Sequence, residues 1–388
     1  MSTPSTYLDN NATTRVAPEV LDAMLPYLTG CYGNPSSTHR AGVEAREGLI
    51  RARSAVAVLL SAKPAEIIFT SGCTESNHHA ILGALASVPG KRRIVTSAVE
   101  HPSTLMLLRD LERQGFMVTL LPVDSSGQID AREFEAGLTP DVALVSLMWA
   151  NNETGVLFPI AELAAKTKER GILFHTDAAQ AVGRIPIDLT AVPADLLSFS
   201  GHKFHAPKGV GGLFVRTGLK WPMLIRGHQE RRRRGGTENL PAIAGLGAAC
   251  AIAAQSMLRE TERIGVLRNR LEAGLMDAIA GMSVNGGDSR RLPNTSNLCL
   301  GNIDGEALLA RLDQRGIFAS SGAACSSGGS EPSHVLTAMG IGRDRASSCV
   351  RFSLSRYTTA AEIETVIEIV PSIIRELSAA EWQERAAL

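Results

Sequence analysis

The first two thirds of the chain alternate short apolar runs with helical patterns. Helical stretches such as Ile160–Arg170 separate several of the apolar runs. This alternation predicts a mostly parallel, doubly wound α/β sheet with helices on both of its faces. The runs that we expect to form its strands are Ile67–Thr70, Ile94–Val99, Val118–Val123, Val142–Met148, Ile172–Phe174, Leu196–Phe199 and Val210–Val215.

A change of pattern after about Pro241 predicts a second, smaller domain. Apolar residues recur at helical spacing between Arg259 and Ala280, which indicates an amphipathic helix. Short strand and helix patterns follow, and Val350–Leu354 alternates apolar and polar residues. We therefore expect a large α/β domain over residues 16–259 and a smaller α+β domain built from residues 1–15 and 260–388.

Composition and charge narrow the class of protein. The chain has 388 residues, of which 44% are hydrophobic, 20% charged and 4% aromatic, as is typical of a globular enzyme. Its 39 basic residues balance 39 acidic ones, so the net charge favours neither nucleic acid nor an anionic membrane as a partner. No apolar run approaches the ~18 residues of a membrane span. The N-terminus also lacks the pattern of a signal peptide, which favours a cytoplasmic protein.

The six cysteines are scattered and form no Cys-x-x-Cys pair, so the sequence indicates neither a disulfide framework nor a zinc site. Cys325 is distinctive, because serine and glycine flank it on both sides between Ser320 and Ser330. Such a segment favours an accessible loop over a core strand or helix. Four other cysteines fit the usual role of a small buried hydrophobic side chain, namely Cys31, Cys250, Cys299 and Cys349.

Polar residues directly follow four of the predicted strands. In a parallel sheet these strand ends lie along one edge, where α/β proteins hold their ligands. Each residue taken alone also fits a helix cap or a turn, but four sets at corresponding positions favour one shared pocket. The sets are Glu100-His101, Asn151-Asn152-Glu153, His175-Thr176-Asp177 with Gln180, and Ser200-Gly201-His202-Lys203.

Two segments suggest a particular chemistry. Ser71–Ser76 is a turn of small residues that opens a predicted helix, and the free backbone N–H groups of such a turn bind anions. Lys203 places an amine at the end of a strand, where a lowered pKa would let it form a Schiff base with an aldehyde. A surface lysine in a polar loop explains this short segment equally well when it is considered alone.

Four motifs follow one another along the chain, and together they resemble a known enzyme family. They are Asp177-Ala-Ala-Gln180, Ser200-Gly-His202-Lys203, Ser320-Ser-Gly-Ala-Ala-Cys325 and Arg351-Phe-Ser-Leu-Ser. This set is similar to the pyridoxal-phosphate-dependent cysteine desulfurases of the NifS/IscS class, over almost the whole chain from Tyr7 to about Pro371. Met148-Trp-Ala-Asn-Asn-Glu-Thr-Gly resembles the NifS branch most closely. The resemblance implies the fold-type I architecture of aspartate aminotransferase-like enzymes, with the cofactor in the large domain.

The resemblance also implies how the cofactor, pyridoxal 5′-phosphate, would be held. Lys203 would bind it as a Schiff base and later move protons at the substrate α-carbon. Asp177 would keep the pyridine nitrogen protonated, and His101 would stack on the ring and act as an acid/base group. The remaining contacts would come from Gln180 and Asn152 at the phenolic oxygen, and from Cys73, Thr74, Ser200 and His202 at the phosphate, with Thr237 reaching the phosphate of the other subunit of a homodimer.

The substrate implied by the resemblance is L-cysteine. Arg351 would bind its carboxylate bidentately, with help from Asn34, while Asn152 would also contact the substrate. The thiolate of Cys325 would attack the substrate sulfur, so that alanine leaves and a persulfide remains on the enzyme. The sulfur would pass to an iron–sulfur scaffold protein of the NifU/IscU type, and Cys325 would ligate a cluster only transiently, through that persulfide. Nitrogenase maturation is the pathway that the NifS branch implies.

Other readings stay open at this point. A selenocysteine lyase or an aminotransferase on the same fold would still need Lys203 and Asp177 but could dispense with Cys325. A non-catalytic scaffold that binds sulfur or a cluster is disfavoured by the intact set of Lys203, Asp177 and His101. Cys73 stands where relatives commonly carry alanine or glycine, so a second reactive thiol beside the phosphate is also open.

Overall fold

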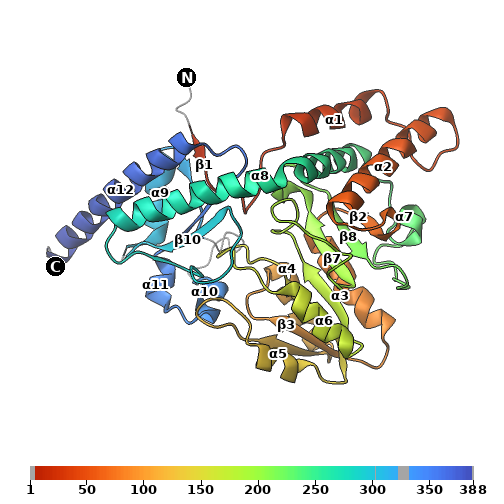
Figure 1. Cartoon of the computed structure of the whole chain (residues 1–388), viewed down its shortest axis with the longest axis horizontal. Helices are drawn as coiled ribbons and strands as arrows, with labels where there is room; N and C mark the ends of the chain where they lie inside the picture. The colour runs from red at the N-terminus through yellow and green to blue at the C-terminus, as the bar shows by residue number, and fades with distance from the viewer. Residues whose placement is uncertain (1–4, 302, 322–331, 387–388) are drawn as a thin grey trace.

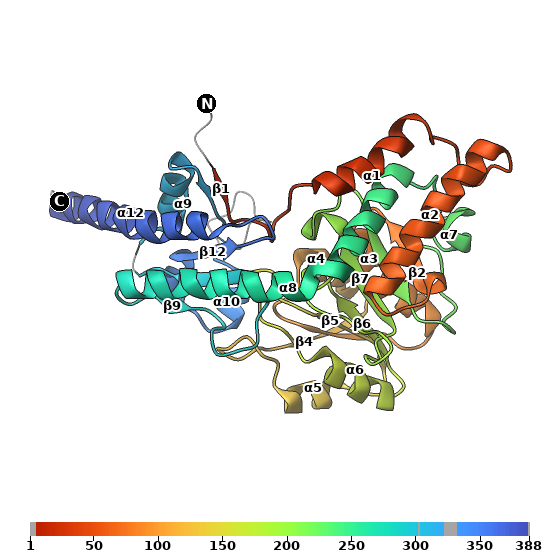
Figure 2. The same ribbon diagram turned by 45° about the horizontal axis from the view of Figure 1, so that its top comes forward.

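The computed structural model describes residues 5–301, 303–321 and 332–386. Within these residues, helix α8 (Leu240–Ala278) runs from the larger part of the molecule into the smaller one (Figures 1 and 2). The N-terminal strand and the C-terminal helix α12 (Ala360–Ala386) both lie in the smaller part. The predicted domain boundaries stay a proposal, because α8 crosses the expected division near residue 260.

A seven-stranded sheet in the order β2-β8-β7-β6-β5-β3-β4 forms the larger part. Neighbouring strands pair in parallel except at β8, which runs antiparallel to both of its neighbours. The mostly parallel sheet is therefore confirmed, and every strand begins within one residue of its predicted start. The strands are β2 (Ile67–Thr70), β3 (Arg93–Ser97), β4 (Met117–Leu121), β5 (Val142–Met148), β6 (Leu173–Asp177), β7 (Leu196–Ser200) and β8 (Gly211–Val215).

Helices cover both faces of this sheet, because successive side chains of a strand point to opposite sides. Ile94 and Leu144 pack into one apolar cluster with α3 and α4, whereas the adjacent Val95 and Val145 belong to another cluster with α5 and α6. This alternation is the doubly wound arrangement that the sequence predicts. The four helices are α3 (Cys73–Ser87), α4 (Pro102–Arg113), α5 (Ala131–Gly137) and α6 (Ile160–Glu169).

The first half of α8 packs against α1 (Pro18–Thr29) and α2 (Arg40–Leu59). Small residues permit a close approach: a Cβ atom added at Gly247 would lie 2.6 Å from the Cα of Ala52. Contrary to the sequence analysis, α8 is long and apolar enough to cross a membrane by composition, with a mean hydropathy of 1.5 in its best window. Since 56% of that window is buried inside the protein, α8 has the character of a core helix.

The smaller part contains a three-stranded antiparallel sheet in the order β12-β10-β9 and a parallel pair of β1 and β11. The predicted amphipathic helix is the second half of α8, whose Ile264, Leu271 and Leu275 are buried in the core of this part. The other elements after the sheet of the larger part are α7 (Gln229–Arg232), β9 (Ser283–Val284), β10 (Thr295–Cys299), α9 (Gly305–Gln314), β11 (Ile317–Phe318), α10 (His334–Ala338), α11 (Arg343–Ser347) and β12 (Cys349–Ser353), and β1 is Thr6–Tyr7.

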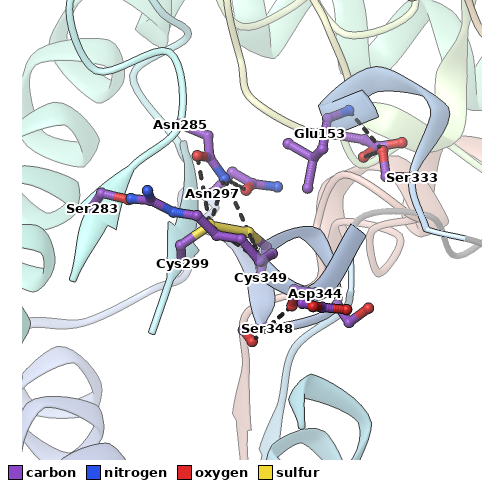
Figure 3. The surroundings of a disulfide bond; sticks show 12 residues. Glu153, Ser283, Asn285, Asn297, Cys299, Ser333, Asp344, Ser348 and Cys349 are labelled. Atoms are coloured by element: carbon purple, nitrogen blue, oxygen red, sulfur yellow. Dashed lines mark hydrogen bonds between the residues drawn. A yellow bond between two sulfur atoms is a disulfide. The ribbon is translucent and has the colours of Figure 1, made fainter. Parts of the chain in front are cut away.

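A disulfide in the smaller part corrects the expectation that the cysteines form none. Cys299 and Cys349 lie opposite each other in the pairing of β10 with β12, their Cα atoms 4.2 Å apart, and their sulfurs are bonded (Figure 3). The spacing of the cysteines could not indicate this bond, because strand register alone brings together residues 50 positions apart. Both are buried, as predicted, and so is Cys250, whereas Cys31 is only half-buried.

Candidate active site

A cavity of about 570 Å³ opens at the carboxyl ends of the parallel strands. The convergence of polar residues that the strand ends predicted is therefore present in the structure. Ten of the residues singled out from the sequence line this cavity: Cys73, Thr74, His101, Asn152, Asp177, Gln180, Ser200, His202, Lys203 and Arg351.

Lys203 ends the short 3₁₀ turn Gly201–Lys203 that follows β7. Its Nζ donates to the carbonyl oxygens of Asn11, at 2.7 Å, and Ala12, at 2.9 Å. Arg184 stabilises the turn, because its Nη2 donates to the carbonyl oxygen of Lys203 at 2.9 Å. The amine of Lys203 therefore points toward Asn11 and Ala12 of the N-terminal segment, which line the same cavity.

Asn11 and Arg184 are site residues that the sequence analysis missed. Asn11 connects three other residues of the site. Its carbonyl oxygen accepts hydrogen bonds from Nζ of Lys203 and from Nε2 of Gln180, and its side-chain amide donates to the carbonyl oxygen of Asn152. Arg184 also donates to the side-chain oxygens of Asn11 and Gln180. The polar stretch around Asn11 was the available signal, but nothing local predicts its contacts with residues more than a hundred positions away.

Asp177 ends β6 and is held by three donors. Its Oδ1 accepts from the backbone N–H of Ala179 at 2.9 Å and from Sγ of Cys73 at 3.2 Å, while Oδ2 accepts from Nδ2 of Asn77 at 2.6 Å. A carboxylate accepts about four hydrogen bonds. One further donor, such as a protonated ring nitrogen, therefore fits this carboxylate without displacing any of its present partners.

The surroundings of Cys73 disfavour a second nucleophile at this position. Burial, together with the nearby carboxylate of Asp177, raises the pKa of its thiol well above the ordinary value. Because the thiolate is the nucleophilic form of cysteine, the protonated thiol serves instead as a weak hydrogen-bond donor to Asp177.

The turn between β2 and α3 has the features of a phosphate site. Helix α3 begins at Cys73, and Thr74, Ser200 and His202 line the cavity beside its N-terminus, where backbone N–H groups are available to an anion. A Cβ atom added at Gly211 would lie 2.8 Å from the Cα of Gly72, so glycine is needed where β8 passes this turn. Burial and the neighbouring Lys203 lower the pKa of His202 to about 4, which leaves its ring neutral.

Arg351 extends from β12 to the other side of the cavity. Its Nη2 lies 2.6 Å from Oδ1 of Asp9, and its Nη1 donates to the carbonyl oxygen of Asn152 at 2.9 Å. The backbone of Arg351 also pairs with Ser320, close to the point where the described chain breaks before residue 322. A buried guanidinium that two acceptors hold in place is suited to a planar carboxylate.

We expect Arg351→Lys to raise the KM for L-cysteine, the substrate that the resemblance implies, by about 10- to 100-fold. A charged hydrogen bond contributes about 1.5–3 kcal/mol, and lysine lacks the planar fork. Steady-state kinetics of the purified variant measure the change. Arg270→Lys is the matched control, because Arg270 is exposed and paired with Glu364 far from the cavity. An unchanged KM in the Arg351 variant would argue against carboxylate binding by this residue.

Two predicted residues among those that the structure describes, Asn34 and Thr237, do not line the cavity. Asn34 is exposed, and its Oδ1 accepts from the backbone N–H of Ser36 at 2.9 Å, which is the geometry of a local turn. Thr237 is also exposed. Cys325 lies outside the described residues. The single chain therefore does not bring Asn34 or Thr237 to its own cavity, and their predicted roles remain proposals.

Glu100, directly before His101, is fully buried. Its Oε1 accepts from Oγ of Ser97 at 2.6 Å and from the backbone N–H of Met148 at 2.9 Å, while Oε2 has no hydrogen-bond partner among the described residues. Burial raises the pKa of Glu100 from 4.5 to about 8. The side chain is therefore protonated at neutral pH, with the role of a buried neutral acid.

A consequence for stability follows from Glu100. The folded protein binds this proton up to about pH 8 and the unfolded chain only up to about 4.5, so the group's contribution to stability is lost as the pH rises through this window. We expect Glu100→Gln to remove this loss and to be more stable than the parent at pH 9, by a few kcal/mol at about 1.4 kcal/mol per pKa unit, but equal to it at pH 5. Urea unfolding at both pH values measures it, and parallel pH dependences would contradict the expectation.

The residues of the cavity fit pyridoxal phosphate. An amine for the aldehyde, a carboxylate with room for one more donor, and a helix N-terminus with hydroxyl groups line one cavity. Burial lowers the pKa of His101, so its ring is neutral at pH 7 and suited to stacking on an aromatic cofactor. No cluster of three potential metal ligands occurs within the described parts of the chain.

Comparisons with known proteins show the family of this chain. The family model described as aminotransferase class-V matches residues 6–366. The chain is 53% identical to cysteine desulfurase 2 of Trichormus variabilis, covering 96% of this chain and 94% of that protein. It is 51% identical to the cysteine desulfurase NifS of Azotobacter vinelandii, covering 96% and 93%. The solved structure of a NifS-like protein superimposes with a TM-score of 0.91 at 37% identity, covering 96% of this chain and all of that one.

Proposed function

The chain belongs to the aminotransferase class-V family and is a pyridoxal-phosphate-dependent cysteine desulfurase of fold type I, and from this premise we propose that it passes sulfur from Cys325 to an iron–sulfur scaffold protein. The observation that carries the desulfurase chemistry is the cavity in which Lys203, Asp177, His101 and Arg351 meet, and the transfer to a scaffold is the step that the experiment below tests. The alternatives on the same fold, a selenocysteine lyase or an aminotransferase, have no observation in their favour.

The residues of the cavity divide the work of the reaction. Arg351 binds the carboxylate of L-cysteine and so fixes the position of its α-carbon. Lys203 moves the α-proton, and neutral His101 is placed to exchange a proton with the substrate. Asp177 would hold the proton of the cofactor ring. Bound pyridoxal phosphate supplies an electron sink for the negative charge that develops at the α-carbon.

Sulfur leaves the substrate by attack of the Cys325 thiolate on the sulfur of L-cysteine. A sulfur–sulfur bond forms as the carbon–sulfur bond breaks, and the electron pair of the broken bond stays on carbon. The carbon takes up a proton and leaves as alanine, so that the persulfide retains the transferred sulfur. We assign this attack to Cys325 and not to Cys73, whose buried thiol donates a hydrogen bond to Asp177 and has a raised pKa.

A homodimer with shared sites accounts for the two residues that the chain's own cavity lacks. Thr237 and Asn34 are both exposed, and a second copy would bring Thr237 to the phosphate and Asn34 to the substrate. Exposed apolar side chains on α1, including Leu21, Leu25 and Leu28, offer a surface for such a copy.

A role in nitrogenase maturation is supported by the 51% identity to a protein named NifS. A cytoplasmic location remains a prediction from the sequence.

The proposed function is tested by measuring where the sulfur of L-cysteine goes. Holoenzyme is incubated with L-cysteine, and alanine is quantified with and without a purified apo scaffold protein of the NifU type or the IscU type. We expect one alanine per sulfur transferred and faster cluster formation on the NifU-type scaffold. A keto acid in place of alanine would favour an aminotransferase, while turnover of selenocysteine alone would favour a lyase. Equal use of both scaffolds would contradict the nitrogenase role only.

A further inference from the structure

A chain of hydrogen bonds joins Asp177 to His101 through two residues that the reaction described above does not use. Nδ2 of Asn77 donates to Oδ2 of Asp177 at 2.6 Å and to Oγ of Ser103 at 3.1 Å. Ser103 in turn contacts Nδ1 of His101 twice, through its backbone N–H at 3.1 Å and its hydroxyl at 2.9 Å. Asn77 is fully buried, and His101 and Ser103 are half-buried.

The direction of each bond in this chain is determined by chemistry. The amide nitrogen of Asn77 must face Asp177, because the amide oxygen would repel the carboxylate. Ser103 Oγ accepts from that amide and therefore has its own hydrogen to donate. The backbone N–H of Ser103 is only a donor, so Nδ1 of His101 is an acceptor and the proton of the neutral ring is on Nε2.

We propose that Asn77 and Ser103 are positioning residues that couple Asp177 to His101, fixing the carboxylate and holding the imidazole as the neutral Nε2–H tautomer. The inference rests on the roles proposed above for Asp177 and His101. Helix α3 holds Ser103 at a second point, since Nε2 of His78 lies 3.1 Å from the carbonyl oxygen of Ser103. The end of β6, the first turns of α3 and the start of α4 thus form one connected unit.

The charged groups around His101 have opposing effects on its pKa. Asp177 favours the protonated ring, while Lys203 and His334 oppose it, and the adjacent Glu100 is neutral at pH 7. Burial is the largest influence and lowers the pKa of His101. The backbone N–H of Ser103 acts in the same sense as burial, because it can only donate and a proton on Nδ1 would break its hydrogen bond.

Two readouts on the holoenzyme test this inference. The first is the pKa and tautomer of His101, measured by NMR on protein with isotope-labelled histidine and assigned with a His101→Gln variant. The second is the pH dependence of kcat/KM for L-cysteine. We expect Ser103→Ala to raise the pKa of His101 by about half a unit to one unit, the shift expected from losing one hydrogen bond to the neutral ring, and to move the acidic limb of kcat/KM equally upward.

Matched variants distinguish a positioning role of Ser103 and Asn77 from a purely structural role. Ser103→Thr keeps the hydroxyl and restores the parent values, while Asn77→Ala shifts both readouts as Ser103→Ala does and also weakens cofactor binding. Thr104→Val is the control, because Thr104 is buried one residue further along α4 and its hydroxyl has no hydrogen-bond partner among the described residues. Ser103→Ala and Thr104→Val giving the same pKa for His101 would overturn the inference. A parent enzyme that forms no alanine would refute the proposed function instead, and the NMR readout would still decide this inference.

Discussion

Lys203→Ala loses turnover of L-cysteine by about 10³-fold or more, because general acid–base catalysis alone contributes about 10²–10⁴-fold and the variant also loses the covalent attachment of the cofactor. The fold should survive this change. The turn Gly201–Lys203 is held through the carbonyl oxygen of Lys203, which alanine retains, by a hydrogen bond from Arg184. Alanine formation under saturating pyridoxal phosphate is the measurement.

Borohydride reduction provides a second readout for Lys203. Reduction of the parent holoenzyme should leave the cofactor attached to the peptide that contains Lys203, and reduction of the variant should leave it unattached. Lys220→Ala is the control, because Lys220 is exposed and outside the cavity. Labelling of any other lysine in the parent would refute the assignment of Lys203, whatever the activity of the variant.

Cys325→Ala is expected to abolish sulfur transfer, with loss of activity of at least about 10³-fold, since no other nucleophile replaces a missing thiolate. The cofactor and L-cysteine should still bind, because the contacts proposed to hold them come from Lys203, Asp177 and Arg351. The absorption spectrum of the holoenzyme and its change on addition of L-cysteine measure binding, and alanine and sulfide measure transfer.

Two other thiols serve as comparisons for this variant. Cys31→Ala should retain full activity, because Cys31 lies beyond the end of α1 and outside the cavity. Cys73→Ala should retain sulfur transfer, because burial and Asp177 hold the pKa of the Cys73 thiol too high for a nucleophile. Full activity of Cys325→Ala, or loss of sulfur transfer in Cys73→Ala, would mean that the sulfur takes another route.

The fold could be predicted from the sequence where local pattern determines it. Strands of continuous apolar residues begin where predicted, because burial on both faces leaves an unbroken apolar run that the sequence displays. The convergence of His101, Asn152, Asp177 and Lys203 was predictable for a related reason, since parallel strands end at a common edge.

Contacts between distant segments could not be predicted in this way. The hydrogen bonds of Asn11 with Asn152 and Lys203 depend on where the N-terminal segment docks. The facing of Cys299 and Cys349 depends on strand register within the small sheet. Register and docking are determined by the packing of whole elements, which no local spacing records.

The most direct test of the central claim is the position of the persulfide after one turnover. Holoenzyme is mixed with a single equivalent of L-cysteine per site, trapped with an alkylating reagent, digested and mapped by mass spectrometry. A desulfurase that works as proposed carries the extra sulfur on Cys325, in an amount equal to the alanine released. A persulfide on any other cysteine, or alanine released with no sulfur on the protein, would contradict the account.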